Sequence, residues 1–119
     1  MTVNDINGWK APGVVSACHV GGTTQLLFSV GGEQVTCSSG AGTNTITFAH
    51  TLNHQKFTAF IIPRDQSPSN NATASFRGWG EISSRSNTSF TMKFYDSEGK
   101  IHAAGGSDTQ FDLVLISWE

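Results

Sequence analysis

The stretch Gly40–Asp65, GAGTNTITFAHTLNHQKFTAFIIPRD, indicates the fold class of this chain. Thr45–Ala49 alternates polar and apolar residues with the two-residue period of a half-buried strand. After a polar connection at 51–55, Lys56–Ile62 is rich in aromatic and β-branched residues, and it stops at Pro63, a residue disfavoured inside sheets. The stretch predicts a strand, a turn and a second strand, which we expect to form a β-hairpin.

Further strand-like segments lie on both sides of this stretch. The glycine pairs that separate the upstream segments favour a meander with tight turns, and the glycines around Trp79 favour a bulge or a bent edge. No window shows the 3.6-residue period of an amphipathic helix. We therefore expect an all-β protein, an antiparallel β-sandwich of jelly-roll-like type with little or no helix. The other predicted strands are 14–20, 25–30, 33–38, 73–82, 89–95 and 110–118.

The last predicted strand is apolar on both of its faces. A strand of this kind is expected in the centre of a sheet or beneath a partner subunit. One face carries Phe111, Leu113 and Leu115, and the other carries Val114, Ile116 and Trp118.

The length of 119 residues predicts one domain, at 13–119, preceded by a polar arm at 1–12. Trp9 in this arm either anchors it to its own domain or docks it on another subunit or a larger assembly.

The charge pattern argues against two classes of partner. Only 13% of the residues are charged, the net charge is −2, and the seven Lys and Arg residues are scattered. Binding of a nucleic-acid backbone or an anionic membrane needs clustered basic residues, so neither is expected. The chain has no apolar run long enough to span a membrane, and its first residues lack the features of a signal peptide. We therefore expect synthesis in a cytoplasm without membrane insertion.

No motif points to catalysis or to a metal. His50 and His54 flank the expected turn and are interpreted as turn polarity, and His19 as a satisfied strand-edge residue. The carboxylates are dispersed, and no nucleophile elbow or phosphate-binding loop is present. We expect no enzyme activity, no cofactor and no metal. Cys18 and Cys37 are interpreted as buried apolar residues, with a disulfide as the less favoured alternative in a cytosolically made protein.

What remains is recognition by the surface. An exposed aromatic side chain beside charged groups can stack on a sugar and form hydrogen bonds to it. The alternative is that Trp79 belongs to the core and that the charged groups are merely solvated. The candidate ligand-binding residues, all near predicted loops, are Arg64, Asp65, Arg77, Trp79 and His102.

The order of motifs resembles that of bacteriophage tail-fibre tip domains. Gly40–Phe48 (GAGTNTITF) is similar to their glycine-rich strand, and Lys56–Ile61 (KFTAFI) to the strand that follows it. Ser86–Gly99 and the terminal strand from Phe111 to Trp118 continue the likeness. Asn44 departs from the aromatic surroundings usual in that strand. The resemblance covers about residues 13–119.

The resemblance implies a homotrimeric virion structural protein, either a fibre tip or a capsid knob or decoration protein. Such a protein would be made in the host cytoplasm, attach to other capsid or tail proteins and adhere to the host surface, where a glycan is a possible ligand. The same strand order also resembles H-type lectins, which are trimeric sugar-binding sandwiches, so a soluble lectin is the alternative. The expected attachment and trimer contacts are Trp9, Val114, Ile116 and Trp118.

Overall fold

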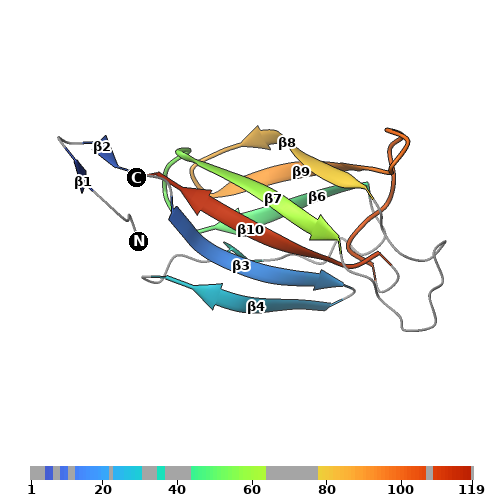
Figure 1. Ribbon diagram of the computed structural model, residues 1–119, viewed down its shortest axis with the longest axis horizontal. Coiled ribbons are helices and arrows are strands. Elements are labelled where there is room, and N and C mark those ends of the chain that lie inside the picture. The colour runs from blue at the N-terminus through green and yellow to red at the C-terminus, as the bar shows by residue number, and fades with distance from the viewer. Residues whose placement is uncertain are drawn as a thin grey trace.

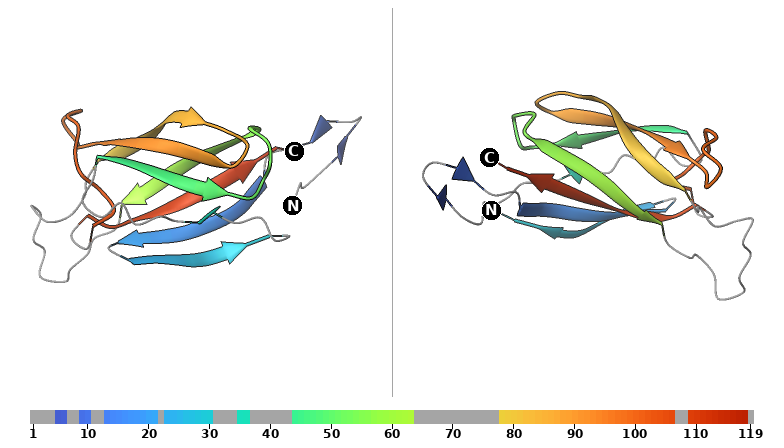
Figure 2. Two further views of the ribbon diagram at one scale, coloured as in Figure 1. Left: turned by 180° about the vertical axis from the view of Figure 1, so that it is seen from behind. Right: turned by 45° about the horizontal axis from the view of Figure 1, so that its top comes forward.

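The computed structural model describes residues 5–6, 9–10, 13–21, 23–30, 35–36, 44–63, 78–106 and 109–118. Throughout these residues the regular elements are β-strands, and none of them is helical. Two four-stranded antiparallel sheets pack face to face (Figures 1 and 2). The predicted all-β sandwich is therefore confirmed.

The first sheet has the strand order β4-β3-β10-β7. It is made of β3 (Gly13–Gly21), β4 (Thr23–Ser29), β7 (Phe57–Pro63) and β10 (Phe111–Ser117). The strand that is apolar on both faces, β10, pairs with β3 on one side and β7 on the other. Its predicted central position is thus confirmed.

The second sheet has the order β5-β6-β9-β8. It is made of β5 (Val35–Thr36), β6 (Thr45–His50), β8 (Trp79–Arg85) and β9 (Ser89–Tyr95). Separately from both sheets, β1 (Asp5–Ile6) pairs with β2 (Trp9–Lys10) within the N-terminal arm.

The prediction of a β-hairpin at Gly40–Asp65 is wrong. Both strands form, but β6 pairs with β9 and β5, whereas β7 pairs with β10. The connection between them crosses from one sheet to the other, so Phe48 and Phe57 enter the core from opposite sheets. The predicted meander continues only as far as β4, which pairs with β3. It is wrong beyond β4, because β4 and β5 belong to different sheets.

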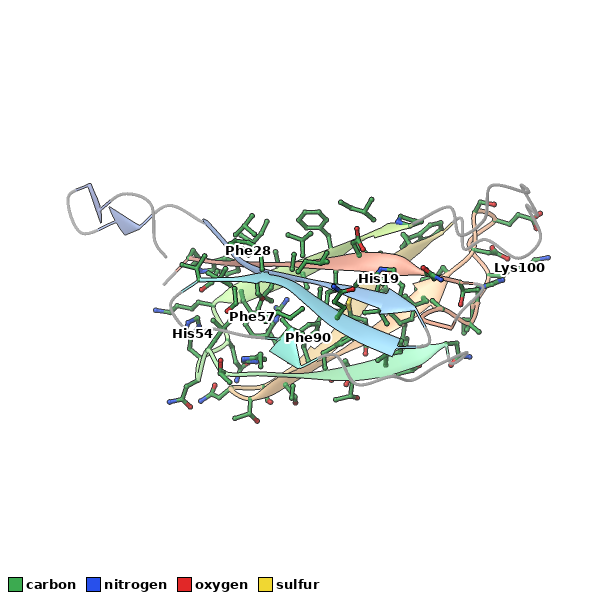
Figure 3. All side chains as sticks on the ribbon, turned by 90° about the horizontal axis from the view of Figure 1, so that it is seen from below. His19, Phe28, His54, Phe57, Phe90 and Lys100 are labelled. Carbon is green, nitrogen blue, oxygen red and sulfur yellow. The ribbon has the colours of Figure 1, made fainter. Side chains whose placement is uncertain are left out.

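The core consists of the inward-facing residues of both sheets. Aromatic rings dominate one end of it: the ring centroids of Phe48 and Phe90 lie 5.3 Å apart, and those of Phe57 and Phe90 lie 5.6 Å apart. Phe57 and Phe90 come from opposite sheets and meet between the layers (Figure 3). Toward the opposite end, the ring centroids of Phe94 of one sheet and Phe111 of the other lie 5.2 Å apart. These contacts pack the two sheets against each other.

Cys18 is fully buried on the inner side of β3 and is disulfide-bonded. The chain has one other cysteine, Cys37, which lies outside the described residues. The favoured interpretation of a free, buried apolar residue is therefore wrong for Cys18, although its burial is as expected. The nearby strands β3 and β5 contact each other across the sheets.

The strand directions separate two ends of the sandwich. β3 begins and β10 ends at one end, where Gly13 pairs with Ser117. β8 begins and β9 ends at the opposite end, next to the turn at 96–100 (Figure 1). Any surface near the start of β8 is therefore far from the end of β10.

Candidate functional site

An apolar surface covers the outer side of the first sheet. Phe28, Ala17, Val114 and Phe60 are consecutive cross-strand partners, so they form one row across all four strands. Partners directly opposite each other point to the same side of a sheet. Neighbouring rows add further apolar residues, and we call the whole surface the apolar face. It consists of Val14, Ala17, Phe28, Phe60, Ile62, Val114, Ile116 and Trp118.

The apolar face is substantially solvent-exposed. Phe28, Phe60 and Trp118 expose 44%, 42% and 39% of their surface, and Val14 and Ile62 expose similar fractions. From the area of such side chains, the face presents roughly 500 Å² of apolar surface. The largest apolar patch of a typical monomeric protein is about 300–600 Å², and patches of this size are often interaction sites.

A polar pair interrupts this face. His19 of β3 and Asp112 of β10 are cross-strand partners, and their Nδ1 and Oδ1 atoms lie 3.0 Å apart. The two side chains are largely buried among their neighbours. His19 is therefore satisfied as predicted, but it lies in a central strand and not at an edge of the sheet.

The edge strand β4 extends the apolar character to the rim of the sheet. Leu26, Leu27 and Phe28 are consecutive and all exposed. A register irregularity between Ala17 and Cys18 of β3 accommodates an extra residue of β4 there. Exposed apolar edge strands invite pairing with another chain, and monomeric proteins usually place charges or proline on them.

The outer side of the second sheet is polar. Thr47 and Thr91 are cross-strand partners whose hydroxyl oxygens lie 2.9 Å apart. In the adjacent row, Lys93 lies between Glu81 and Thr45. We call these five residues the polar face.

One apolar strip lies at the end of the polar face. Trp79 of β8 pairs with Tyr95 of β9, and Tyr95 forms a bridge to Ile101. Trp79 exposes 46% and Ile101 61% of its surface. The rings of Trp79 and Tyr95 are stacked, with centroids 5.7 Å apart and an interplanar angle of 25°. We call Trp79, Tyr95 and Ile101 the aromatic strip.

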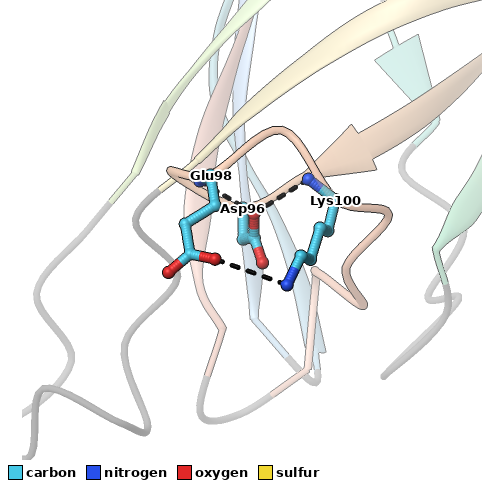
Figure 4. Close-up of polar contacts among 3 residues, drawn as sticks. All are labelled: Asp96, Glu98 and Lys100. Carbon is cyan, nitrogen blue, oxygen red and sulfur yellow. Dashed lines mark hydrogen bonds and ion pairs between the residues drawn. The ribbon is translucent and has the colours of Figure 1, made fainter.

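Polar contacts hold the aromatic strip in place. The Tyr95 hydroxyl donates a hydrogen bond of 2.7 Å to Glu81 Oε1, and this bond raises the pKa of Tyr95. In the adjoining turn, Asp96 Oδ1 accepts hydrogen bonds from the backbone N–H groups of Lys100 and Glu98, each 2.9 Å long (Figure 4). The backbone hydrogen bond from Lys100 is the main reason that the pKa of Asp96 is lowered.

The predicted ligand-binding residues differ in where the structure places them. Trp79 is exposed and not part of the core, and it lies on the edge strand β8. The bulge in β8 is between Ile82 and Ser84, away from Trp79. His102 is half-buried, and its Nδ1–H donates to the Ala103 carbonyl at 2.6 Å. It is therefore engaged with the backbone of its own turn. Arg64, Asp65 and Arg77 lie outside the described residues.

Three of the four predicted trimer contacts lie on the same surface. Val114, Ile116 and Trp118 face outward, opposite the buried Phe111, Leu113 and Leu115, so all three belong to the apolar face. The side chain of Trp9 lies outside the described part of the chain. The partners of this set, Phe28 and Phe60, could not be predicted from the sequence, because only strand pairing brings them into one row with Val114.

The prediction that His50 is a polar residue of a surface turn is wrong. His50 is buried, and its ring packs edge-on against Phe57 at 4.6 Å. Its Nδ1 accepts a hydrogen bond from the Leu52 N–H, and its Nε2–H donates to the Ser86 carbonyl. His54 does fit the prediction, since its Nδ1 accepts from the Lys56 N–H within the connection.

Among the described residues, no cluster of His, Cys, Asp or Glu could hold a metal ion, and no helix could cross a membrane. No protein-family model matches the chain, and neither a curated protein nor a solved structure matches it significantly. The two outer surfaces of the sandwich therefore remain as the candidate functional features.

Proposed function

We propose that this protein is a non-enzymatic structural subunit of a bacteriophage virion, a homotrimeric fibre-tip or capsid knob that adheres to the host surface. The apolar face is the observation that carries the proposal. It offers a self-association surface on the outer side of the first sheet, with Val114 at its centre. The trimeric state and the virion location come from the resemblance of the strand motifs to tail-fibre tip domains.

The size of the apolar face fits a stable subunit interface. A standard interface buries about 800 Å² on each partner. A little more than half of such an area is non-polar, or about 450 Å². The roughly 500 Å² of exposed apolar surface estimated for the apolar face supplies this amount for contact with one neighbouring copy. A second copy of the chain would cover the exposed rings of Phe28 and Phe60 together with the edge strand β4.

The alternative function is that of a soluble carbohydrate-binding lectin. The exposed Trp79 and its stacked partner Tyr95 favour it, because exposed aromatic rings are suited to sugar binding. The two functions differ in their partners: a virion subunit is incorporated into particles, and a lectin is not.

The mass in solution tests the proposal. Size-exclusion chromatography with light scattering at micromolar concentration is expected to give a mass of three chains. A single chain of 12.7 kDa under these conditions would contradict it. Incorporation into phage particles, detected by co-sedimentation with assembled capsids or tails, separates the virion subunit from the lectin.

A further inference from the structure

The aromatic strip differs from the remaining exposed apolar side chains. Most large exposed apolar residues lie on or next to the strands of the first sheet, where self-association would cover them. Trp79 and Ile101 instead flank Tyr95 on the outer side of the second sheet, next to polar residues. Neither core packing nor the proposed subunit interface accounts for their exposure.

The surroundings of the strip fix its shape in advance of any ligand. A Cβ atom at Gly78 would lie 1.5 Å from the carbonyl oxygen of Tyr95, so only glycine allows the chain to enter β8 there. Gly99 adopts a φ of +84°, which favours glycine and lets the adjoining turn close beside Trp79. The turn at Gly99 thus lies next to the Trp79 ring, which stacks on Tyr95. A preorganised surface loses less conformational entropy when it binds.

Hydrogen-bonding groups border the strip on one side. The exposed carboxylate of Glu81 accepts the hydrogen bond from the Tyr95 hydroxyl. The exposed Lys93 lies directly opposite Glu81 in the adjacent row. An acceptor and a cationic donor therefore lie beside an exposed, largely aromatic surface, which suits a ligand with one apolar face and several hydroxyl groups.

The dimensions favour a small ligand over a protein. Neighbouring strands are about 4.8 Å apart, so the strip measures about 10 Å from Trp79 to Ile101. That length accommodates two linked pyranose rings. Its apolar area of roughly 250 Å² is only about half of the roughly 450 Å² of non-polar area that each partner contributes to a standard protein interface.

We propose that the aromatic strip, with Glu81 and Lys93, is a binding site for an oligosaccharide. The C–H face of one pyranose ring packs on the exposed part of the Trp79 indole, and the next ring lies over the exposed edges of Tyr95 and Ile101. Ring hydroxyl groups donate to the Glu81 carboxylate and accept from the Lys93 ammonium group. This inference rests on the adhesion part of the proposed function, to which it adds the ligand class and the site.

The position of the strip is compatible with self-association. The apolar face and the polar face lie on opposite sides of the sandwich (Figure 2). An assembly formed through the apolar face would leave each copy of the strip exposed to solvent. Several weak sites in one assembly then bind a polysaccharide more tightly than any single site does.

Binding to an array of immobilised di- to tetrasaccharides, followed by titration of the best-bound sugar in solution, tests the site. The unmodified protein is expected to bind at least one sugar family. Trp79→Ala is expected to weaken the solution affinity at least 10-fold, and Glu81→Gln by a few-fold. Trp118→Ala, which removes an exposed tryptophan from the other sheet, is the matched control and is expected to leave the affinity of a single site unchanged.

Near-ultraviolet circular dichroism and light scattering of each variant separate loss of the site from loss of fold or assembly. Trp79→Ala is expected to keep the oligomeric mass of the unmodified protein. An array without binding to any sugar would overturn the inference, as would equal affinities of Trp79→Ala and the unmodified protein. A monomeric protein that still binds sugar through Trp79 would overturn the proposed assembly and leave the site intact.

Discussion

The two outer surfaces of the sandwich differ in the polarity of their side chains. The apolar face places Phe28, Val114 and Phe60 in one row, whereas the polar face places Thr47 and Thr91 at comparable positions. The edge strands differ in the same way. β4 exposes Leu26 and its neighbours, but β8 beyond Trp79 exposes mainly polar and charged side chains.

This difference supports the proposal that one surface is adapted to water and the other to a partner. Both sheets contribute inward-facing residues to the core, and the residues of the apolar face are not among them. Exposed apolar area of this extent lowers solubility unless another surface covers it. The contrast is therefore the strongest physical support for self-association.

The largest expected effect comes from a charge on the apolar face. Phe60→Lys removes a half-exposed ring from an edge strand, so we expect the isolated domain to fold. In the assembly, an unpaired buried ammonium group costs about 3 kcal/mol or more. This corresponds to at least a hundredfold weaker association.

The matched variant for this experiment is Thr47→Lys, which places the same charge on the polar face. Light scattering over a range of concentrations is expected to show a smaller mass for Phe60→Lys and no change for Thr47→Lys. Equal masses for both variants would remove the distinction between the two faces.

The second prediction concerns the disulfide of Cys18, which lies beneath the apolar face. A disulfide restricts the unfolded chain. The two cysteines of the sequence are at positions 18 and 37, and a disulfide that closes a loop of about 15–20 residues stabilises the fold by about 3 kcal/mol. Urea unfolding with and without a reducing agent is expected to show this loss. If reduction leaves the unfolding midpoint unchanged, the disulfide does not stabilise the first sheet.

The third prediction concerns the second sheet, which His50 supports from inside. His50→Ala removes ring contacts with Phe57 and leaves the Leu52 N–H and the Ser86 carbonyl without their partner. We expect a loss of about 2–3 kcal/mol in the free energy of unfolding. His54→Ala is the control, with an expected loss below about 0.5 kcal/mol because this residue lies near the surface. Equal losses would mean that burial of His50 contributes nothing.

The smallest expected effect distinguishes two buried serines of the first sheet. Ser117 Oγ donates to the Lys56 carbonyl at 3.2 Å, whereas Ser16 Oγ is buried without a hydrogen-bond partner. Ser16→Ala is therefore expected to raise the free energy of unfolding by about 1 kcal/mol, and Ser117→Ala to lower it by a similar amount. Thermal unfolding of both variants measures the difference. Destabilisation by Ser16→Ala would contradict the assignment of an unsatisfied hydroxyl.

Strand positions were predictable because side-chain alternation is a local property. Ser89–Tyr95 alternates along its whole length, and β9 has the same bounds. The two-faced apolar pattern of the last strand indicated a central position, and β10 has it. In both cases the information lies in neighbouring residues of the chain.

Strand pairing was not predictable in the same way. The Gly40–Asp65 stretch has the local pattern of a hairpin, but its two strands lie in different sheets. A strand with one apolar face can pair with a sequence neighbour or cross to the opposite sheet, and it buries the same residues in both cases. The partner is chosen by how all the strands together fill the core, which no short stretch of sequence contains.

The candidate surfaces show the same division. The sequence alone determined that Val114, Ile116 and Trp118 share one side of a strand and that Trp79 lies in a weak, glycine-flanked strand. Tertiary structure alone placed Phe28 and Phe60 in the row of Val114, stacked Trp79 on Tyr95, and buried His50 while leaving His54 near the surface. The physical reason is that alternation acts between neighbours in the chain, whereas a surface is formed by residues whose strands are brought together only by folding.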